Sequence, residues 1–199
     1  MIGSGIQKPL LTKRKNRKRE EQMMIQIYDS FLPDHIFRSV HSEIVGLKFY
    51  DKKTHPQTLQ EGWNFPGTRT EELNSAVPLV DSVILNYLDS LGSVFTRHMY
   101  KANNYAHLRL ECDNSRDYIH TDPHSFAYLL YLSATNLESG TKMYSSIDQD
   151  KDNENCFVKF VQNRLLIYDA ATPHMSWGNH GTDISNGRLT INGFCTYAQ

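Results

Sequence analysis

The chain has 199 residues, of which 39% are hydrophobic and 22% are charged, and its formal net charge at pH 7 is −1. This length suits one domain with a substantial core and is too short for two comfortable domains. No apolar run approaches the roughly 20 residues that span a bilayer, and no apolar segment follows the cationic N-terminus, so we expect a cytoplasmic protein without a membrane helix or secretory signal.

Basic residues are concentrated at the N-terminus. Seven of the 21 lysines and arginines lie within the first 19 positions, and no acidic residue precedes Glu20. Residues 1–22 show no hydrophobic period, so we expect a flexible basic tail ahead of a single domain over 23–199. Residues 20–199 carry 14 basic against 22 acidic residues, which makes this part of the chain a poor platform for a phosphate backbone. We therefore do not expect the domain to bind nucleic acid, which could contact only the basic tail. A solvated tail without a partner is the simpler interpretation.

Residues 34–91 are expected to provide helical support for the remainder of the domain. Ile25, Ile27 and Tyr28 first alternate as in a short strand. Apolar residues at helical spacing then predict one helix over 34–48 and a second over 71–91. Pro78 lies inside the second pattern, so that helix is expected to begin later than its first apolar residue.

A long polar segment over 51–70 separates the two predicted helices and is interrupted by proline and glycine. A loop of this length inside a compact domain is usually functional or mobile. Trp63 and Phe65 lie within its 58–70 portion, which is expected either to close over an active site as a lid or simply to cover one end of the domain.

The pattern changes after Gly92 to short apolar and β-branched runs separated by turn residues, which is typical of a sandwich or barrel. Candidate strands lie at 94–100, 105–111, 117–121, 126–133, 140–145, 156–161, 164–168, 173–177 and 187–197. The predicted class is therefore α+β, with two N-terminal helices and a β barrel or jelly roll over 94–197.

A candidate metal site begins with His120 and Asp122 in the sequence YIHTD. In a strand, residues i and i+2 point to the same face, so this imidazole and carboxylate are expected to converge. Such a pair arises easily by chance, but His174 follows 52 residues after Asp122, behind an apolar run, and Arg188 follows 14 residues later. Two histidines and one carboxylate leave three positions of an iron(II) ion open, enough for a bidentate keto acid and O2. An arginine beside a threonine hydroxyl suits the far carboxylate of that acid.

These segments, in this order, resemble the 2-oxoglutarate/Fe(II)-dependent oxygenase superfamily in its prolyl 4-hydroxylase-like branch. YIHTD, AYLLYLS followed by ESGTKMY, NRLLIYDAATPH and GRLTINGF carry the resemblance, which covers about 94–197. It implies a double-stranded β-helix, or jelly roll, flanked by the two helices. It also implies a dioxygenase that uses O2 and 2-oxoglutarate, releases succinate and CO2, and hydroxylates its substrate. The branch suggests a peptidyl proline as that substrate, and a free amino acid, another protein side chain or a nucleobase stays equally open.

By position, the resemblance implies residue roles. The iron ligands would be His120, Asp122 and His174, and these three would be the catalytic centre. Arg188 would bind the C5 carboxylate of 2-oxoglutarate, Tyr131 would donate its hydroxyl to that carboxylate, and Thr190 is a second candidate donor.

Three points remain open in the sequence. The spacing between His174 and Arg188 is longer than is common in the branch, and His180 would give eight residues; His174 is preferred because it follows the apolar strand. His124 follows Pro123, which breaks the strand, so it is expected at the mouth of the site and not on the metal. The alternatives are a cupin-like metalloenzyme without 2-oxoglutarate, which leaves Arg188 unexplained, and a non-catalytic binding module, against which the complete residue set argues.

Overall fold

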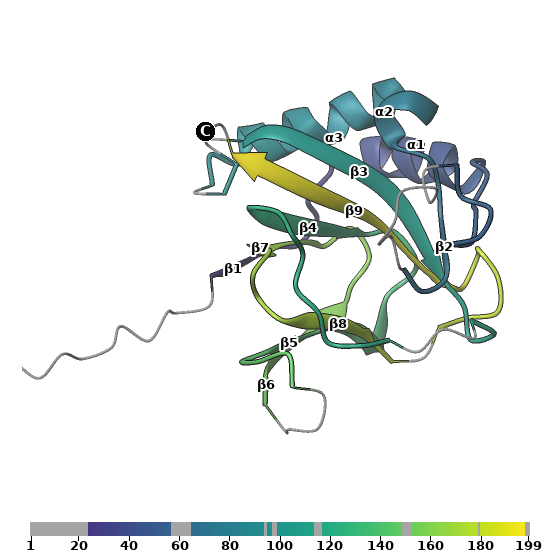
Figure 1. Ribbon diagram of the computed structural model, residues 1–199. Helices are drawn as coiled ribbons and strands as arrows, with labels where there is room; N and C mark the ends of the chain where they lie inside the picture. The colour runs from purple at the N-terminus through teal and green to yellow at the C-terminus, as the bar shows by residue number, and fades with distance from the viewer. Residues whose placement is uncertain are drawn as a thin grey trace, which may run out of the picture.

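The computed structural model is a β-rich domain with helices on one side (Figure 1). It describes residues 24–56, 65–93, 95–96, 99–113, 117–148, 153–178 and 180–197, and only the backbone of 99–100. The predicted tail over 1–22 and the 58–64 portion of the predicted lid lie outside the described residues. No helix in the described ranges is long and apolar enough to cross a membrane.

Two antiparallel sheets make up the β portion. The larger sheet has the order β1 (Ile25–Tyr28), β7 (Leu165–Asp169), β4 (Phe126–Tyr131), β9 (Arg188–Tyr197), β3 (Met99–Arg109) and β2 (Thr68–Arg69). The smaller sheet has the order β6 (Glu154–Phe160), β5 (Asn136–Tyr144) and β8 (His174–Trp177). In Figure 1 the smaller sheet lies below the larger one. The described part of the chain is thus mostly β-sheet with few helices, as predicted.

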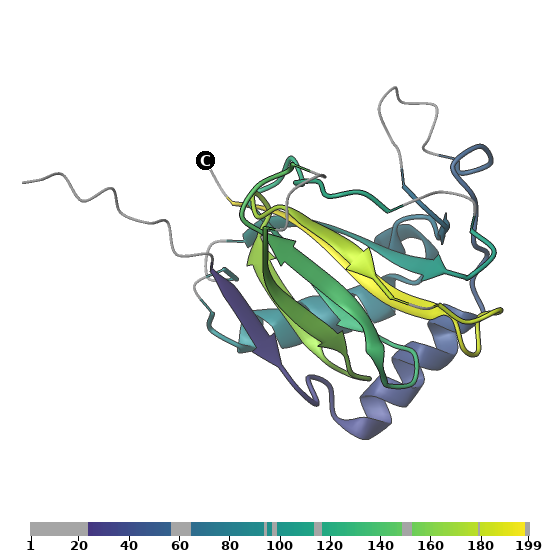
Figure 2. The same cartoon turned by 90° about the horizontal axis from the view of Figure 1, so that it is seen from below.

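Three helices cover the outer face of the larger sheet: α1 (Asp34–Val45), α2 (Leu73–Ala76) and α3 (Pro78–Ser90). Figure 2 shows helices behind the strands, with β1 at one edge of the sheet. The helix predicted over 71–91 is not continuous, because the chain breaks into α2 and α3 at Val77; the later start predicted from Pro78 is confirmed for α3. Pro78 occupies the first position of α3, where the missing N–H of proline costs nothing.

Strict alternation along the central strands gives the larger sheet two different faces. β4 is buried on both sides and supplies the helix-side core with Phe126, Tyr128 and Leu130 and the inter-sheet core with Ala127, Leu129 and Tyr131. On β9, Leu189 and Ile191 join the helix-side core. Because neighbours along a strand point to opposite faces, Arg188 and Thr190 face the space between the sheets.

The predicted strands are found with two exceptions. Residues 94–100 and 105–111 were predicted as separate strands, but 99–109 form the single strand β3. The strand predicted over 117–121 does not form; only an isolated bridge joins His120 to His174. The two-residue strand β2 lies inside a segment predicted to be loop.

Candidate metal centre and its cavity

His120, Asp122 and His174 come together where a loop of the chain meets the start of β8. The His120 amide donates to the His174 carbonyl oxygen at 3.0 Å, and the His174 amide donates back to His120 at 2.8 Å. The Asp122 amide donates to the carbonyl oxygen of Ala170 at 2.9 Å. The loop is therefore tied to both ends of the turn before β8, and this pairing takes the place of the predicted strand.

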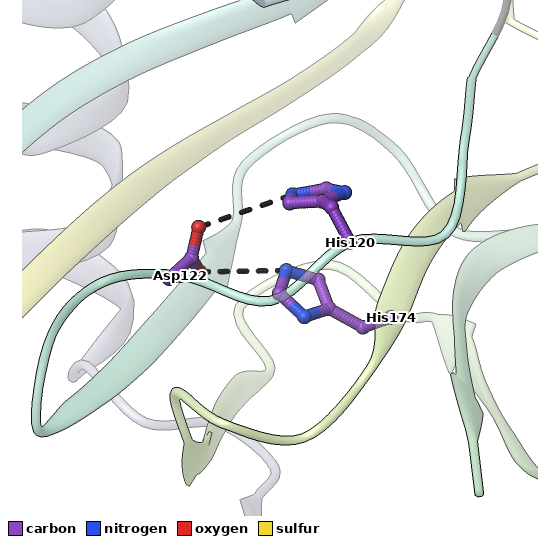
Figure 3. A group of neighbouring side chains, drawn as sticks. All are labelled: His120, Asp122 and His174. Atoms are coloured by element: carbon purple, nitrogen blue, oxygen red, sulfur yellow. Dashed lines mark ion pairs between the residues drawn. The ribbon is translucent and has the colours of Figure 1, made fainter. Parts of the chain in front are cut away.

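The three side chains point toward one another (Figure 3), and one candidate ligand atom from each lies within 4.8 Å of the others. Asp122 Oδ2 lies 3.4 Å from His174 Nε2, and Asp122 Oδ1 lies 3.9 Å from His120 Nε2. The centroids of the two imidazole rings are 4.4 Å apart. This is the only cluster of three or more such ligand groups among the described residues.

Backbone carbonyls fix which nitrogen of each imidazole faces the carboxylate. His120 Nδ1 lies 3.0 Å from the Tyr118 carbonyl oxygen, and His174 Nδ1 lies 2.9 Å from that of Thr172. Since a carbonyl oxygen only accepts, each Nδ1 carries the proton and each Nε2 presents a lone pair, as in metal-binding histidines. Burial also lowers the pKa of His174 to about 4, so this imidazole is neutral at pH 7.

The carboxylate side of the cluster is consistent with a bound cation. Asp122 Oδ2 is buried and has no hydrogen-bond partner within the described residues, although the His174 lone pair lies nearby. Two acceptors at this distance are stabilised when a cation lies between them, and buried polar atoms without partners are uncommon. The hydroxyl of Tyr168, 3.1 Å from His174 Nε2, is the polar neighbour that a metal would displace. The residues present therefore fit a divalent transition metal.

The cluster opens into a cavity of about 710 Å³ between the two sheets. Its walls include the inner faces of β3, β8 and β9 and residues near β2. Arg188, only 5% exposed, lines the same cavity as the three candidate ligands. Burial lowers the pKa of Arg188, but a guanidinium remains charged at pH 7. One cavity thus holds both the candidate metal ligands and a buried cation.

Arg188 is held by the hydroxyl of Thr141, a residue that was not predicted as part of the site. Arg188 Nη2 donates to Thr141 Oγ1 at 3.2 Å, and Thr141 Oγ1 lies 2.8 Å from the Tyr131 hydroxyl. Thr141 lines the cavity, whereas Tyr131 and Thr190 do not. The Thr190 hydroxyl donates to Asn192 Oδ1 at 2.6 Å and makes no hydrogen bond to Arg188. The sequence could have indicated Thr141 only through its spacing. It lies two residues before the buried Met143 of β5, so the two side chains share one face of the strand.

Comparison with known proteins finds similarity in structure only. No family model matches the sequence, and no curated protein sequence does. A prolyl-4-hydroxylase from Pseudomonas putida matches with a TM-score of 0.58 and 13% identity, over 88% of this chain and 94% of that chain. A prolyl hydroxylase from Trichoplax adhaerens, in complex with a hypoxia inducible factor oxygen degradation domain peptide fragment, matches with a TM-score of 0.61 and 12% identity, over 87% and 83%. HygX from Streptomyces hygroscopicus, with nickel and 2-oxoglutarate bound, matches with a TM-score of 0.57 and 13% identity, over 86% and 82%.

The chain has the fold of these oxygenases. The resemblance to 2-oxoglutarate/Fe(II)-dependent oxygenases in their prolyl 4-hydroxylase-like branch, predicted from the sequence, is therefore confirmed at the level of fold. At these identities the likeness establishes fold alone, so the activity has to be argued from the site.

Within this fold, His180 and His124, which the sequence left open as candidates, lie outside the cluster. His180 Nε2 lies 4.0 Å from Asp117 Oδ2, and Arg109 pairs with the same carboxylate. Although burial opposes ionisation, the neighbouring His180 and the charge of Arg109 hold the pKa of Asp117 at about 2. His124 lines the cavity with its ring 5.3 Å from that of Phe194. The structure thus places His180 beside a different carboxylate, Asp117, and His124 on the cavity wall.

Proposed function

We propose that this protein is an Fe(II)- and 2-oxoglutarate-dependent dioxygenase of the double-stranded β-helix fold, which hydroxylates a substrate and releases succinate and CO2. The observation that carries the proposal is the shared cavity, in which a cluster of two histidines and one carboxylate lies with the buried cation of Arg188. A metal site alone is compatible with many reactions. A metal site with a fixed cation nearby suits a chelating acid that has a second carboxylate.

His120, Asp122 and His174 would hold the iron. Both imidazoles present Nε2 because backbone carbonyls occupy Nδ1, so ligation needs no change of tautomer. Asp122 supplies the negative charge, and its partnerless Oδ2 is the atom that gains most from a cation. Bound iron(II) would supply the redox chemistry and open positions for a keto acid and O2.

Arg188 would bind the C5 carboxylate of 2-oxoglutarate. Its Nε is buried without a hydrogen-bond partner in the described part of the chain, while Nη2 is already fixed by Thr141. A carboxylate at this position satisfies the free donor and neutralises a buried cation, which is otherwise costly to maintain. Thr141 both orients the guanidinium and offers its hydroxyl to the carboxylate, and Tyr131 orients Thr141 in turn.

The cavity walls would limit access of water to the reacting groups. Tyr105, Tyr168 and Phe65 line the cavity and are almost fully buried. In a site of low polarity, charge interactions are stronger than in water, so Arg188 and Asp122 act on bound groups more effectively there. The substrate is then expected to approach over the part of the cavity that the keto acid leaves open.

The direct test is 2-oxoglutarate turnover by the full chain. Protein reconstituted anaerobically with Fe(II) should bind 2-oxoglutarate, and admission of O2 should release succinate in proportion to CO2. A double variant His120→Ala/His174→Ala should bind neither metal nor 2-oxoglutarate tightly, while the exposed His35→Ala on α1 should behave as wild type. Wild-type protein that binds Fe(II) but not 2-oxoglutarate would refute the proposal and favour a metalloenzyme of another class.

A further inference from the structure

Partnerless polar atoms gather in the cavity. Seven buried side-chain nitrogen or oxygen atoms in the described residues have no hydrogen-bond partner, and four belong to residues that line this cavity: Arg69, Asn103, Asp122 and Arg188. The proposed function accounts for two of them, because Asp122 would bind iron and Arg188 would bind 2-oxoglutarate. Arg69 Nε and Asn103 Oδ1 remain, one a donor and the other an acceptor.

Arg69 is a cation without a carboxylate partner of its own. It lies on β2 opposite His107 of β3, with its guanidinium carbon 4.6 Å from the Phe65 ring centroid and 5.6 Å from that of Phe194. No ion pair or hydrogen bond of its side chain occurs within the described ranges. Burial lowers its pKa to about 10, which still leaves it charged at pH 7, and Asp122 is the carboxylate that most offsets this effect.

Asn103 lies next to Phe194, one of the two rings near Arg69. On β3 it is the direct partner of Phe194 in the pairing with β9, and paired residues have Cβ atoms about 4.5–5.5 Å apart. The free acceptor of Asn103 and the free donor of Arg69 therefore both belong to neighbours of Phe194, and all three residues line the same cavity.

The charges in the cavity indicate what that ligand carries. If the proposed function holds, iron(II) with Asp122 has one net positive charge and Arg188 adds a second, and the two carboxylates of 2-oxoglutarate neutralise both. Asp117, also on the cavity wall, shares Arg109 with Asp113, and neither of these carboxylates acts on Arg69. Asp122 is the carboxylate whose charge acts on Arg69, and iron would occupy it, so Arg69 remains a buried positive charge without a carboxylate of its own. Buried charges are stable when they are paired, so the counter-charge is expected to arrive with the substrate.

We infer that the substrate, in a protein with the proposed function, carries a carboxylate that binds Arg69, with an N–H or O–H group that donates to Asn103. A carboxylate fits better than a phosphate, because one cation balances one negative charge and a phosphate ester carries about two. The planar guanidinium fork, held against Phe65, matches a carboxylate in geometry as well. Amino acids, N-acyl amino acids and the C-terminal residues of peptides share this combination, and a neutral nucleobase lacks it.

The site can be tested without knowing the substrate. Full-length protein is loaded with zinc(II), which is diamagnetic, and with saturating 2-oxoglutarate, and the arginine Nε–H resonances are followed by NMR. The Arg69 resonance is assigned by its loss in Arg69→Lys. Titration with acetate should shift it saturably, whereas acetamide, which has the same shape without the charge, should not. Arg38, exposed on α1, supplies an internal control resonance that should not respond.

Further ligands distinguish the sources of the carboxylate. N-acetylglycine should shift the Arg69 resonance at lower concentration than acetate, because it also offers a donor to Asn103, and Asn103→Ala should remove this advantage. Glycine tests the free amino acid in the same way. An Arg69 resonance that no carboxylate shifts, or that inorganic phosphate shifts at lower concentration than acetate, would overturn the inference. The response of the Arg188 resonance to 2-oxoglutarate separately tests the proposed function.

Discussion

Replacing Arg188 by methionine separates 2-oxoglutarate binding from metal binding. Arg188 is not one of the three candidate metal ligands, so Arg188→Met should retain the affinity for a divalent metal. Its side chain is only 5% exposed, and its Nε has no hydrogen-bond partner in the described part of the chain. A carboxylate bound there would therefore depend strongly on this guanidinium.

The magnitude follows from the burial of the pair. Truncating one partner of a buried, hydrogen-bonded charge pair costs about 2–5 kcal/mol, which corresponds to a loss of roughly 30-fold to several thousandfold in affinity. Arg188→Lys should lie between methionine and arginine, because an ammonium is a point charge and does not reproduce the fork. Without 2-oxoglutarate, Arg188→Met should not lower the melting temperature, since it removes a buried cation that has no carboxylate partner.

The assay is calorimetric titration of 2-oxoglutarate into nickel(II)-loaded protein, with metal content measured for each variant. Arg38→Met, which makes the same chemical change on the exposed side of α1, is the matched control and should bind as wild type. Equal 2-oxoglutarate affinity in Arg188→Met and wild type would refute the assignment of Arg188. A large fall in melting temperature would show that the guanidinium has a structural role instead.

The remaining predictions concern the ligands, the hydroxyls, pH and the tail. His174→Ala should abolish stoichiometric metal binding in calorimetry, whereas His180→Ala should leave it nearly intact, because His180 pairs with a different carboxylate. Thr141→Val should weaken 2-oxoglutarate binding by about 1.5–3 kcal/mol, the usual range for a hydrogen bond to a charged group, and Tyr131→Phe should weaken it less because Tyr131 acts through Thr141. Metal-free protein should lose stability, measured by denaturant titration, as pH falls from 6.5 to 4. Burial holds the pKa of His174 at about 4, whereas an unfolded histidine titrates near 6.5. The unfolded state therefore binds more protons in this window, and the free energy of unfolding should fall by on the order of 3 kcal/mol. Deleting residues 1–22 should leave the melting temperature unchanged, because a run of like charge without apolar period buries little.

Each of these predictions has a contrary outcome. Loss of metal in His180→Ala but not in His174→Ala would move the site to the later histidine. A Tyr131→Phe effect larger than that of Thr141→Val would show that Tyr131 contacts the ligand directly. Stability that is flat between pH 6.5 and 4 would mean that His174 is not buried as a neutral imidazole. A large fall in melting temperature on removing 1–22 would show that the tail is structural.

Strands that contribute to apolar cores could be predicted from the sequence, whereas β3 shows where such prediction fails. Every residue of β4 is buried, so its continuous apolar run gave bounds close to those observed. On β3, Lys101, Asn103 and Asn104 interrupt the apolar pattern, and the sequence therefore suggested two shorter strands, over 94–100 and 105–111. In the structure Asn103 lines the cavity, while the buried Asn104 donates to Asp81 and accepts a hydrogen bond from Tyr128. Polar residues in this strand thus have specific roles in the interior and do not mark a turn.

The candidate ligands could be listed from the sequence, but the reason that they converge could not. The prediction relied on a strand that would place His120 and Asp122 on one face. Instead, mutual backbone hydrogen bonds between His120 and His174 hold the loop, and their partners are 54 residues apart in the chain. Thr141 and Arg69 were missed for the same reason. Thr141 lies in ESGTKMY and Arg69 in the predicted loop over 51–70, but only the sheet pairing brings these two side chains to the cavity.

The position of Arg188 links the stability of the domain to the chemistry proposed for it. Tyr131 and Phe160 stack at 4.4 Å with an interplanar angle of 9°, and both are fully buried in the inter-sheet core. The guanidinium carbon of Arg188 lies 5.8 Å from the centroid of each ring, at the border between this core and the cavity. Arg188 is thus oriented by rigid aromatic groups on one side and by Thr141 on the other, before any ligand binds. Because groups that are already ordered lose less conformational entropy on binding, the aromatic core beside Arg188 would contribute to the proposed affinity for 2-oxoglutarate without contacting it.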